Sequence, residues 1–358
     1  MPPRFRTAAS LALALGFAVL LGPAVAQQNP PVSRIAFGSC ADEEKPQPLW
    51  DAVLAYHPDL FVFTGDNVYG DVHQGRDVAE GEFLAELRES YAEARSVAGF
   101  TRLRRMVPVL ATWDDHDYGL NDSGGDFPLK RESQQLFADF WELPAADPRR
   151  TREGLYHAEI LGPPGKRVQV ILLDTRSFRS PLKPTDAHGA PGKERYLPDP
   201  DPAKTMLGEA QWRWLAERLR EPAEIRVVVS SIQVLAEGHG WERWGNLPAE
   251  RQRLFDLIRD TGARSVVFVS GDRHIGGIYR EERNLPYPIH ELTASGINQF
   301  YAAADEAGPN RIGPVYGLPN FGTIDIDWWA DELRLAVRDG AGQPRREAVI
   351  PISDLRPR

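Results

Sequence analysis

The segment that decides the fold is Leu60–Asp71, which reads LFVFTGDNVYGD. Its first part, Leu60–Thr64, is apolar or β-branched throughout and does not alternate with polar residues, which is typical of a strand buried on both faces of a sheet. The chain then turns polar at Gly65 and Asp66. Because ligands of open α/β sheets bind at the carboxyl ends of the strands, this transition indicates a candidate site.

Similar apolar runs recur along the chain and are separated by helical patterns. Trp212, Leu215 and Leu219, for example, fall on one stripe of a helix. This succession favours an α/β architecture. The expected strands are Arg34–Phe37, Leu60–Thr64, Val109–Thr112, Val168–Leu173, Arg226–Ser230 and Ser265–Ser270, and the expected helices are Leu49–Tyr56, Glu80–Tyr91, Glu132–Phe140, Gly208–Arg220 and Ala249–Thr261.

The last third of the chain has a different pattern, with no long helix expected after Thr261. Ile289–Thr293, Phe321–Ile326 and Leu333–Val337 are typical of strands joined by turns, and we expect them to be antiparallel and to close a second sheet. The Pro- and Gly-rich stretch Ser180–Pro202 predicts a long surface loop, either a lid or an excursion around a site.

The N-terminus is typical of a signal peptide. Arg4 and Arg6 precede the apolar run Ala8–Leu21, and Ala24-Val25-Ala26 matches the small-x-small pattern of a cleavage site. The run is shorter than the roughly 20 residues that span a membrane. We therefore expect a leader over residues 1–26, a short segment over 27–33, one domain over 34–358, and a secreted or periplasmic protein without a membrane span.

Composition excludes several classes of protein. The 358 residues are 42% hydrophobic and 26% charged, which excludes a disordered chain. The net charge is −9, and it becomes −11 without the two arginines of the leader, so no surface for nucleic acid or anionic membrane is expected. The single cysteine, Cys40, excludes an intrachain disulfide and a multi-cysteine metal site. If this acidic protein binds a phosphate, metals or buried arginines must therefore supply the attraction.

Polar side chains follow five of the expected strands. Because clustered carboxylates repel one another unless cations lie between them, this convergence predicts a metal site. Taken singly, each motif is also typical of a turn or of a structural residue. The motifs are Gly38-Ser39-Cys40-Ala41-Asp42, the residues from Gly65 to Asp71, those from Trp113 to Asp122, those from Asp174 to Arg179, and Ser270-Gly271-Asp272-Arg273-His274.

Cys40 and Tyr69 narrow the choice of metal. Carboxylate, Asn and imidazole ligands suit a hard or borderline ion, whereas a thiol and a phenol coordinate well only as anions. A strong Lewis acid such as ferric iron enforces that state. The alternatives are a small buried apolar role for Cys40 and a packed aromatic role for Tyr69.

Taken in order, the motifs resemble those of the PhoD-type alkaline phosphatases, a branch of the calcineurin-like metallophosphoesterases. The resemblance extends from Arg34 to Tyr279 and rests on Gly65-Asp66-x-x-Tyr69, Trp113-Asp114-Asp115-His116-Asp117 with Asn121, Asp174-Thr175-Arg176, and Gly271-Asp272-x-His274. The first motif is also similar to that of purple acid phosphatases. The resemblance implies two packed mixed β-sheets flanked by helices, and a binuclear or larger centre of iron plus calcium, or other divalent metals, that hydrolyses a small phosphate ester.

The resemblance also implies roles for individual residues. Asp66 would bridge the metals. Iron would be bound by Cys40, Tyr69 and Asp272, the second metal or pair of metals by Asn121, Asp174 and Asp115, and His274 would be a further ligand. His116 would polarise the phosphate or protonate the leaving group. Arg176, Arg179 and His239 would contact the substrate, the arginines because a planar guanidinium matches phosphate oxygens.

Two departures from the family pattern, and the roles of two arginines, leave alternatives open. The run from Asp114 to Asp117 replaces the usual Gly-Asn-His-Asp/Glu, so that either Asp115 or Asn121 takes the place of the Asn ligand. The first strand lacks Asp-x-His, and Cys40 or Asp42 fills that place. Arg176 could instead form a salt bridge with Asp174 or a neighbouring acid, and Arg179 could lie on the surface.

Three functions fit these observations. The first is a secreted phosphomonoesterase, and the second is a phosphodiesterase or phospholipase D-like enzyme acting on lipid or polymer phosphodiesters. The third is a non-catalytic exported binding protein on the same fold. Loss of a ligand would favour the third function, yet each strand end retains at least one candidate ligand.

Overall fold

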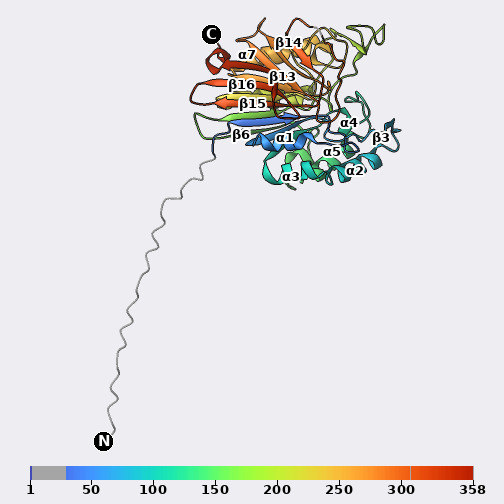
Figure 1. Cartoon of the computed structure of the whole chain (residues 1–358), viewed down its shortest axis with the longest axis horizontal. Coiled ribbons are helices and arrows are strands. Elements are labelled where there is room, and N and C mark those ends of the chain that lie inside the picture. The colour runs from blue at the N-terminus through green and yellow to red at the C-terminus, as the bar shows by residue number, and fades with distance from the viewer. Residues whose placement is uncertain (2–29, 307, 358) are drawn as a thin grey trace.

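The computed structural model describes residues 1, 30–306 and 308–357. Two mixed β-sheets pack face to face, and helices cover their outer faces (Figure 1), so the expected α/β fold of two packed mixed sheets is confirmed. The expected leader lies outside the described residues, except for residue 1. Among the helices that the structure describes, none is long and apolar enough to cross a membrane.

The first sheet has six strands in the order β17-β16-β15-β1-β2-β5. β1, β2 and β5 are parallel, whereas β15, β16 and β17 are antiparallel and join at β1. The strands are β1 (Arg34–Gly38), β2 (Leu60–Thr64), β5 (Val109–Thr112), β15 (Asn320–Asp327), β16 (Glu332–Asp339) and β17 (Pro344–Pro351).

The second sheet has seven strands in the order β14-β12-β13-β11-β10-β7-β6. β7, β10, β11 and β13 are parallel, and β6, β12 and β14 are antiparallel. The strands are β6 (His157–Leu161), β7 (Val168–Leu172), β10 (Ile225–Val229), β11 (Val266–Ser270), β12 (Gly276–Glu281), β13 (Ile289–Ala294) and β14 (Arg311–Tyr316). Two small hairpins complete the strands, β3 (Val72–His73) with β4 (Arg76–Asp77), and β8 (Lys183–Pro184) with β9 (Tyr196–Leu197).

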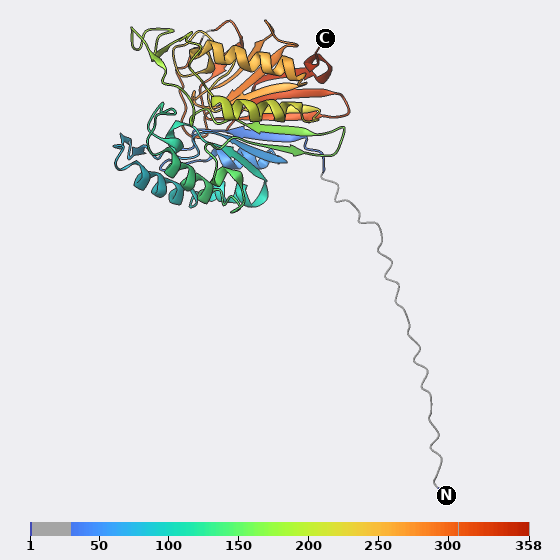
Figure 2. The ribbon, with the colours of Figure 1, turned by 180° about the vertical axis from the view of Figure 1, so that it is seen from behind.

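The helices form the two outer layers. The first sheet is covered by α1 (Leu49–Ala55), α2 (Phe83–Ala94), α3 (Ala98–Met106) and α5 (Lys130–Phe140), and α6 (Gly208–Arg220) and α7 (Pro248–Thr261) lie on the far side of the second sheet (Figure 2). A four-residue helix, α4 (Asp115–Tyr118), follows β5. Three short 3-10 helices lie at Pro148–Arg150, Trp244–Asn246 and Ile352–Leu355. As expected, no α-helix follows Thr261 within the described residues.

The expectation for the C-terminal strands was wrong in its pairing. They do not close one separate sheet: β13 runs parallel to β11 in the second sheet, while β15, β16 and β17 extend the first sheet from β1. The partner of β15 is set by packing, because Gly322 stands opposite Phe37 and leaves room for its ring. Strand alternation predicts which face a residue takes, but not which strand lies beside it.

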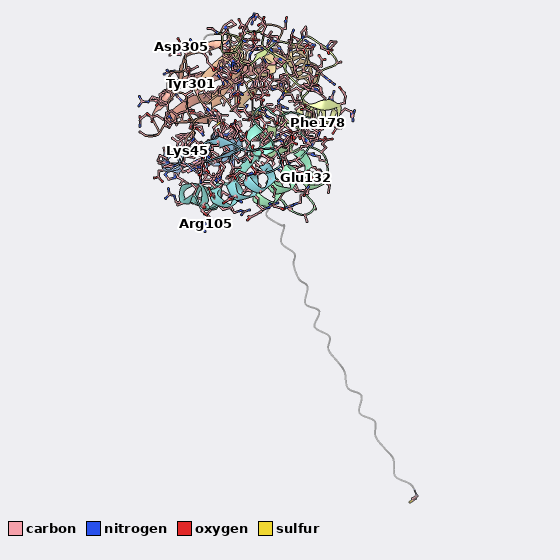
Figure 3. The ribbon with its side chains drawn as sticks, turned by 90° about the vertical axis from the view of Figure 1, so that its right-hand side faces the viewer. Lys45, Arg105, Glu132, Phe178, Tyr301 and Asp305 are labelled. Carbon is pink, nitrogen blue, oxygen red and sulfur yellow. The ribbon has the colours of Figure 1, made fainter. Side chains whose placement is uncertain are left out.

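Two apolar clusters, one on each face of the first sheet, explain why helices lie on one face and the second sheet on the other. In β2, Phe61 and Phe63 belong to the apolar cluster beneath α1, α2 and α3, whereas Leu60 and Val62 pack in the cluster shared with the second sheet. This alternation is the two-residue period of a strand buried on both faces. Figure 3 shows the right-hand side of Figure 1, the side on which α4 and β3 lie.

Candidate metal centre

The candidate ligands lie on tight turns at the ends of strands. Cys40 follows β1, Asp66 follows β2, and Asp272 and His274 follow β11. All four have left-handed backbone, with φ of 62°, 44°, 68° and 57°. L-residues adopt this region at a cost of about 1–2 kcal/mol each, and such strain gathers at functional sites. The turns bring side chains from separate strands to one place.

Acidic, histidine and cysteine side chains form a continuous strip of overlapping clusters. In each cluster the possible ligand atoms lie within 4.8 Å of one another. Asp66 belongs to two of the clusters and Asp115 to three, so these two carboxylates connect the strip. The clusters are Cys40 with Asp66 and His274, Asp66 with Asp115 and His116, Asp114 with Asp115 and Asp272, and Asp115 with Asp122 and Glu242.

The strip leaves three carboxylate oxygens without a hydrogen-bond donor, although Asp115 Oδ1 lies 3.5 Å from Arg176 Nη2. Asp66 Oδ1, Asp114 Oδ2 and Asp115 Oδ1 are buried and accept no hydrogen bond. Buried polar atoms are nearly always paired, so three orphaned oxygens in one strip fit the coordination of cations. The second oxygen of Asp66 lies 3.2 Å from Cys40 Sγ, which makes Cys40 rather than Asp42 the residue of this turn that faces the strip.

The pKa values of the acids also indicate a site for cations. Burial raises the pKa of Asp66 and of Asp272 well above the usual range and that of Asp114 to about 8. Asp115 differs, because Arg176 and His116 outweigh its burial and lower its pKa. Without cations, burial and neighbouring acids thus favour the neutral forms of Asp66, Asp114 and Asp272, and a bound cation would favour their charged forms.

The thiol and the phenol lie at one end of the strip. Burial, with the charge of Asp66, raises the pKa of Cys40, and burial likewise raises the pKa of Tyr69. Tyr69 Oη lies 3.1 Å from His274 Nε2. Burial lowers the pKa of His274 to about 3, so that its imidazole is neutral, the form that binds a metal. Cys40, Tyr69, Asp66 and His274 thus form a compact donor group.

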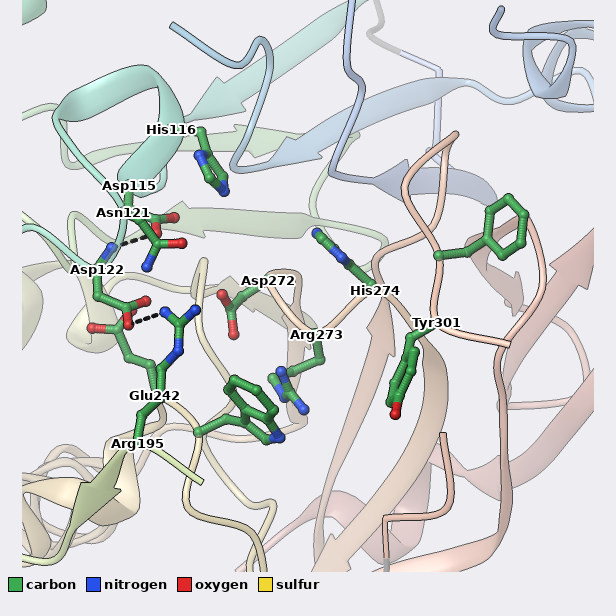
Figure 4. A pocket seen from close by; sticks show the side chains of 12 residues that line it. Asp115, His116, Asn121, Asp122, Arg195, Glu242, Asp272, Arg273, His274 and Tyr301 are labelled. Atoms are coloured by element: carbon green, nitrogen blue, oxygen red, sulfur yellow. Dashed lines mark hydrogen bonds and ion pairs between the residues drawn. The ribbon is translucent and has the colours of Figure 1, made fainter. Parts of the chain in front are cut away.

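His116 is held from two sides. Its Nδ1 lies 2.5 Å from Asp71 Oδ1, and its ring stacks on that of Tyr69 with centroids 4.1 Å apart. Although burial opposes a charged imidazole, Asp115, Asp66 and Asp71 raise the pKa of His116 well above its usual value. The other ring nitrogen, Nε2, is left for the cavity, which His116 lines (Figure 4).

Arg176 and Arg179 do not reach the cavity. The fully buried Arg176 guanidinium lies 2.5 Å from Asp114 Oδ1 and 2.6 Å from Glu242 Oε2, and Arg179 Nη2 lies 2.8 Å from Glu242 Oε1. Neither lines the cavity. Arg176 thus forms salt bridges, as the alternative interpretation expected, but its partners are Asp114 and Glu242 instead of Asp174. These salt bridges position Asp114 and Glu242 from the side of the strip that faces away from the cavity.

Asp174 and Asp42 are occupied by protein donors. Asp174 accepts hydrogen bonds from the backbone of Leu155, Arg176 and Ser177 and from the Ser177 hydroxyl. Asp42 accepts from Gln299 and pairs with Lys45 at 2.8 Å. The structure thus does not bring Asp174 to the strip, because its oxygens stabilise the turn after β7.

His239 also lies apart from the strip. Its Nε2 is 3.0 Å from Gln233 Oε1, and its Nδ1 accepts a hydrogen bond from Trp241 N. Burial lowers the pKa of His239 well below its usual value. With both ring nitrogens engaged, His239 does not line the cavity.

Part of the strip forms one wall of a cavity of about 470 Å³, namely Asp115, His116, Asp122, Glu242, Asp272 and His274. Asn121 lines it beside Asp115, and Arg195 and Arg273 are the arginines of its lining (Figure 4). Both guanidiniums lie against Trp241, at 5.3 and 4.9 Å from the ring centroid. The expected loop Ser180–Pro202 borders the site, since Arg195 and Tyr196 both contact Asp122 Oδ2.

Sequence reasoning missed several residues of this site. Asp114 stood within a quoted motif, and Arg273 stood between Asp272 and His274, so their positions were a usable signal. Asp122 and Glu242 join the strip, and Arg195, Phe300 and Tyr301 line the cavity. Asp122 belongs to the motif after β5, whereas the other four come from loops that no local pattern marks.

The fold is that of a metallophosphatase-like protein. Residues 35–307 match the family model of the PhoD-like phosphatases, and the chain belongs to that family. It is 26% identical over 247 residues to "Alkaline phosphatase D" of Bacillus subtilis (strain 168), a match that covers 63% of this chain and 40% of the relative. The chain thus spans less than half the length of this curated relative.

Two solved structures share the fold. "Structure of PhoD" superposes with a TM-score of 0.69 at 19% identity and covers 90% of this chain and 69% of the other. "GAP50 the anchor in the inner membrane complex of Plasmodium" superposes with a TM-score of 0.56 at 11% identity and covers 92% and 90%. Since one of the two is named as an anchor, likeness of fold does not by itself establish catalysis.

Proposed function

We propose that this chain is an exported, metal-dependent hydrolase of phosphate esters. The observation that carries the proposal is the strip of overlapping clusters, in which Asp66 Oδ1, Asp114 Oδ2 and Asp115 Oδ1 accept no hydrogen bond and of which Asp115, Asp272 and His274 line a cavity. Membership of the PhoD-like phosphatase family supports the same class of reaction.

The donor set fits more than one cation. Cys40, Tyr69, Asp66 and His274 would hold iron, because thiolate and phenolate suit a ferric ion. Asp66, Asp115, Asp272 and Asn121 would hold a second ion or pair of ions, and oxygen ligands of this kind suit calcium or another divalent metal. Bound cations supply Lewis acidity toward the phosphate oxygens and an attacking water.

The remaining steps fall to side chains of the cavity. With Asp71 engaging Nδ1, His116 would present Nε2 toward the ester and would pass a proton from it to the leaving oxygen. Arg195 and Arg273 would contact the non-bridging oxygens in the place first assigned to Arg176 and Arg179, since they line the cavity. Arg176 and Arg179 would position the acids from behind.

The proposal that the protein is exported concerns its localisation. It rests on the leader pattern of Arg4, Arg6, Ala8–Leu21 and Ala24-Val25-Ala26, which lies outside the described residues. An oxidising compartment would also keep iron ferric.

The non-catalytic alternative is less favoured. A binding protein on this fold has no need of a shared set of ligands, whereas here Asp66, Asp115, Asp272 and His274 lie in overlapping clusters, which supports an enzyme. A phosphodiesterase or phospholipase D-like activity uses the same chemistry. Assays with a monoester and a diester distinguish these two activities.

Metal analysis of the purified protein, together with hydrolysis of aryl phosphate mono- and diesters, tests the function. We expect at least two metal ions per chain and turnover of one ester or both. Asp66→Asn should lose bound metal and reduce kcat by at least about 100-fold, because it removes a shared ligand. Asp51→Asn, an exposed change on α1, is the matched control. Absence of metal and of turnover in the wild type would overturn the proposal.

A further inference from the structure

Two large aromatic side chains are exposed at the mouth of the cavity. Phe300 is 44% exposed and Tyr301 is 55% exposed, yet both line the same cavity as the acidic strip. In Figure 4, Tyr301 lies beyond His274, on the opposite side of the cavity from Asp115 and Asn121. Adjacent exposed aromatic residues at a cavity often mark a binding surface.

The loop that carries these rings is fixed to the loops that carry the candidate ligands. Ile297 N donates to Ser39 O at 3.2 Å, and Asn298 N donates to Cys40 O at 3.3 Å. The Asn298 side chain accepts from Asp42 N at 2.8 Å, and Tyr301 N donates to His274 O at 2.8 Å. The backbone that carries the rings is therefore tied to the turns of Cys40 and His274, as a specificity element requires.

Trp241, by contrast, is already occupied. The guanidiniums of Arg195 and Arg273 lie on its ring and pair with Asp122 and Glu306 respectively. Among the three residues Trp241, Phe300 and Tyr301, whose rings line the cavity, Phe300 and Tyr301 are thus the two that carry no stacked guanidinium.

We propose that Phe300 and Tyr301 form a stacking surface for an aromatic group on the alcohol side of the ester. This inference rests on the proposed function, since it assigns a substrate class to the same cavity. A phosphate at the strip would place the esterified group toward the mouth, and a flat ring there gains stacking as well as apolar contact. The shared chemistry is an aryl or nucleobase ring attached through a phosphate.

The test compares two substrates of similar shape, phenyl phosphate and cyclohexyl phosphate. In the double variant Phe300→Leu/Tyr301→Leu, which keeps apolar area but removes the ring faces, kcat/KM for phenyl phosphate should fall about tenfold, mainly through KM. The fall for cyclohexyl phosphate should be markedly smaller. Equal falls for the two esters, or no fall, would overturn the inference.

Control variants separate stacking from general damage. Trp329→Leu removes a 95% exposed aromatic ring at the turn between β15 and β16 and should leave both rates unchanged. The exchange Phe300→Tyr/Tyr301→Phe keeps both ring faces and should keep the preference for phenyl phosphate. Adenosine 5′-monophosphate as a third substrate distinguishes a nucleobase from a simple aryl group.

A binding measurement keeps the inference separate from the function. Phenylphosphonate cannot be hydrolysed, and its affinity for the metal-loaded protein should be about tenfold weaker in the double leucine variant. If the wild type hydrolyses no ester, the proposed function fails. Unchanged phenylphosphonate affinity would overturn the stacking surface in either case.

Discussion

His116 Nδ1 lies 2.5 Å from Asp71 Oδ1, so a carboxylate from the loop after β2 fixes an imidazole from α4. This pair determines which ring nitrogen faces the cavity. Since Asp71 engages Nδ1, Nε2 is the atom that can reach a substrate. The two residues come from different motifs of the sequence and meet only in the fold.

Asp71→Asn should therefore reduce kcat more than it raises KM. An amide can still contact Nδ1, but it does not stabilise the imidazolium, and we expect kcat to fall about 10- to 100-fold. Steady-state kinetics with an aryl phosphate, together with metal content, measures this. Asp77→Asn in the adjacent β4 strand is the matched control, and a loss of metal in Asp71→Asn would mean that Asp71 supports the strip instead.

Cys40 and Tyr69 should give the iron-loaded protein a visible charge-transfer band. A thiolate or phenolate bound to ferric iron absorbs in this range, so Tyr69→Phe and Cys40→Ser should each shift or weaken the band. Absorption spectra of the wild type and of the two variants at equal iron content provide the measurement. A band that is unchanged in both variants would exclude these residues as iron ligands.

Gly322→Ala should destabilise the protein, because β15 packs against β1 at this point. A Cβ atom at Gly322 would lie 2.2 Å from the ring of the buried Phe37, and the ring has no free space to enter. Overpacking of this kind costs about 1–3 kcal/mol in the free energy of unfolding. Denaturant unfolding measures the loss. Gly81→Ala, which meets no atom within 4 Å, should leave stability nearly unchanged.

The sequence predicted the parts of the fold that local patterns determine. Buried apolar runs identified β1, β2, β5, β7, β10 and β11, and boundaries moved by a residue or so, as for β10 at Ile225–Val229. The helix α3 (Ala98–Met106) was missed, and its first turn includes a glycine. The pairing of β15 with β1 depends on contacts between residues almost 300 positions apart.

The site was predictable to the same extent. Residues directly after a buried strand, such as Cys40, Asp66 and Asp272, were found because parallel strands end at one edge. Whether a side chain then faces the cavity depends on its tertiary partners. Arg176 lies behind the strip because it forms salt bridges with Asp114 and Glu242. The carboxylate of Asp174 instead accepts hydrogen bonds within the turn that follows β7. Neither outcome can be derived from spacing.

The pair of Asp147 and Arg149 should make stability depend on pH in acid. Hydrogen bonds from Arg149, 2.9 Å from Nε to Oδ1 and 2.6 Å from Nη2 to Oδ2, lower the pKa of Asp147 to about 2. A carboxyl whose pKa is lower in the folded state adds stability above its unfolded pKa, and this contribution is lost as the pH falls toward the folded value. Because solvent screens a pair near the surface, Asp147→Asn should cost about 1 kcal/mol or less at pH 6, and the difference from wild type should narrow below about pH 4. Urea unfolding at pH 6, 4 and 3 tests this, with Asp354→Asn as an exposed control, and a difference that grows as the pH falls would contradict it.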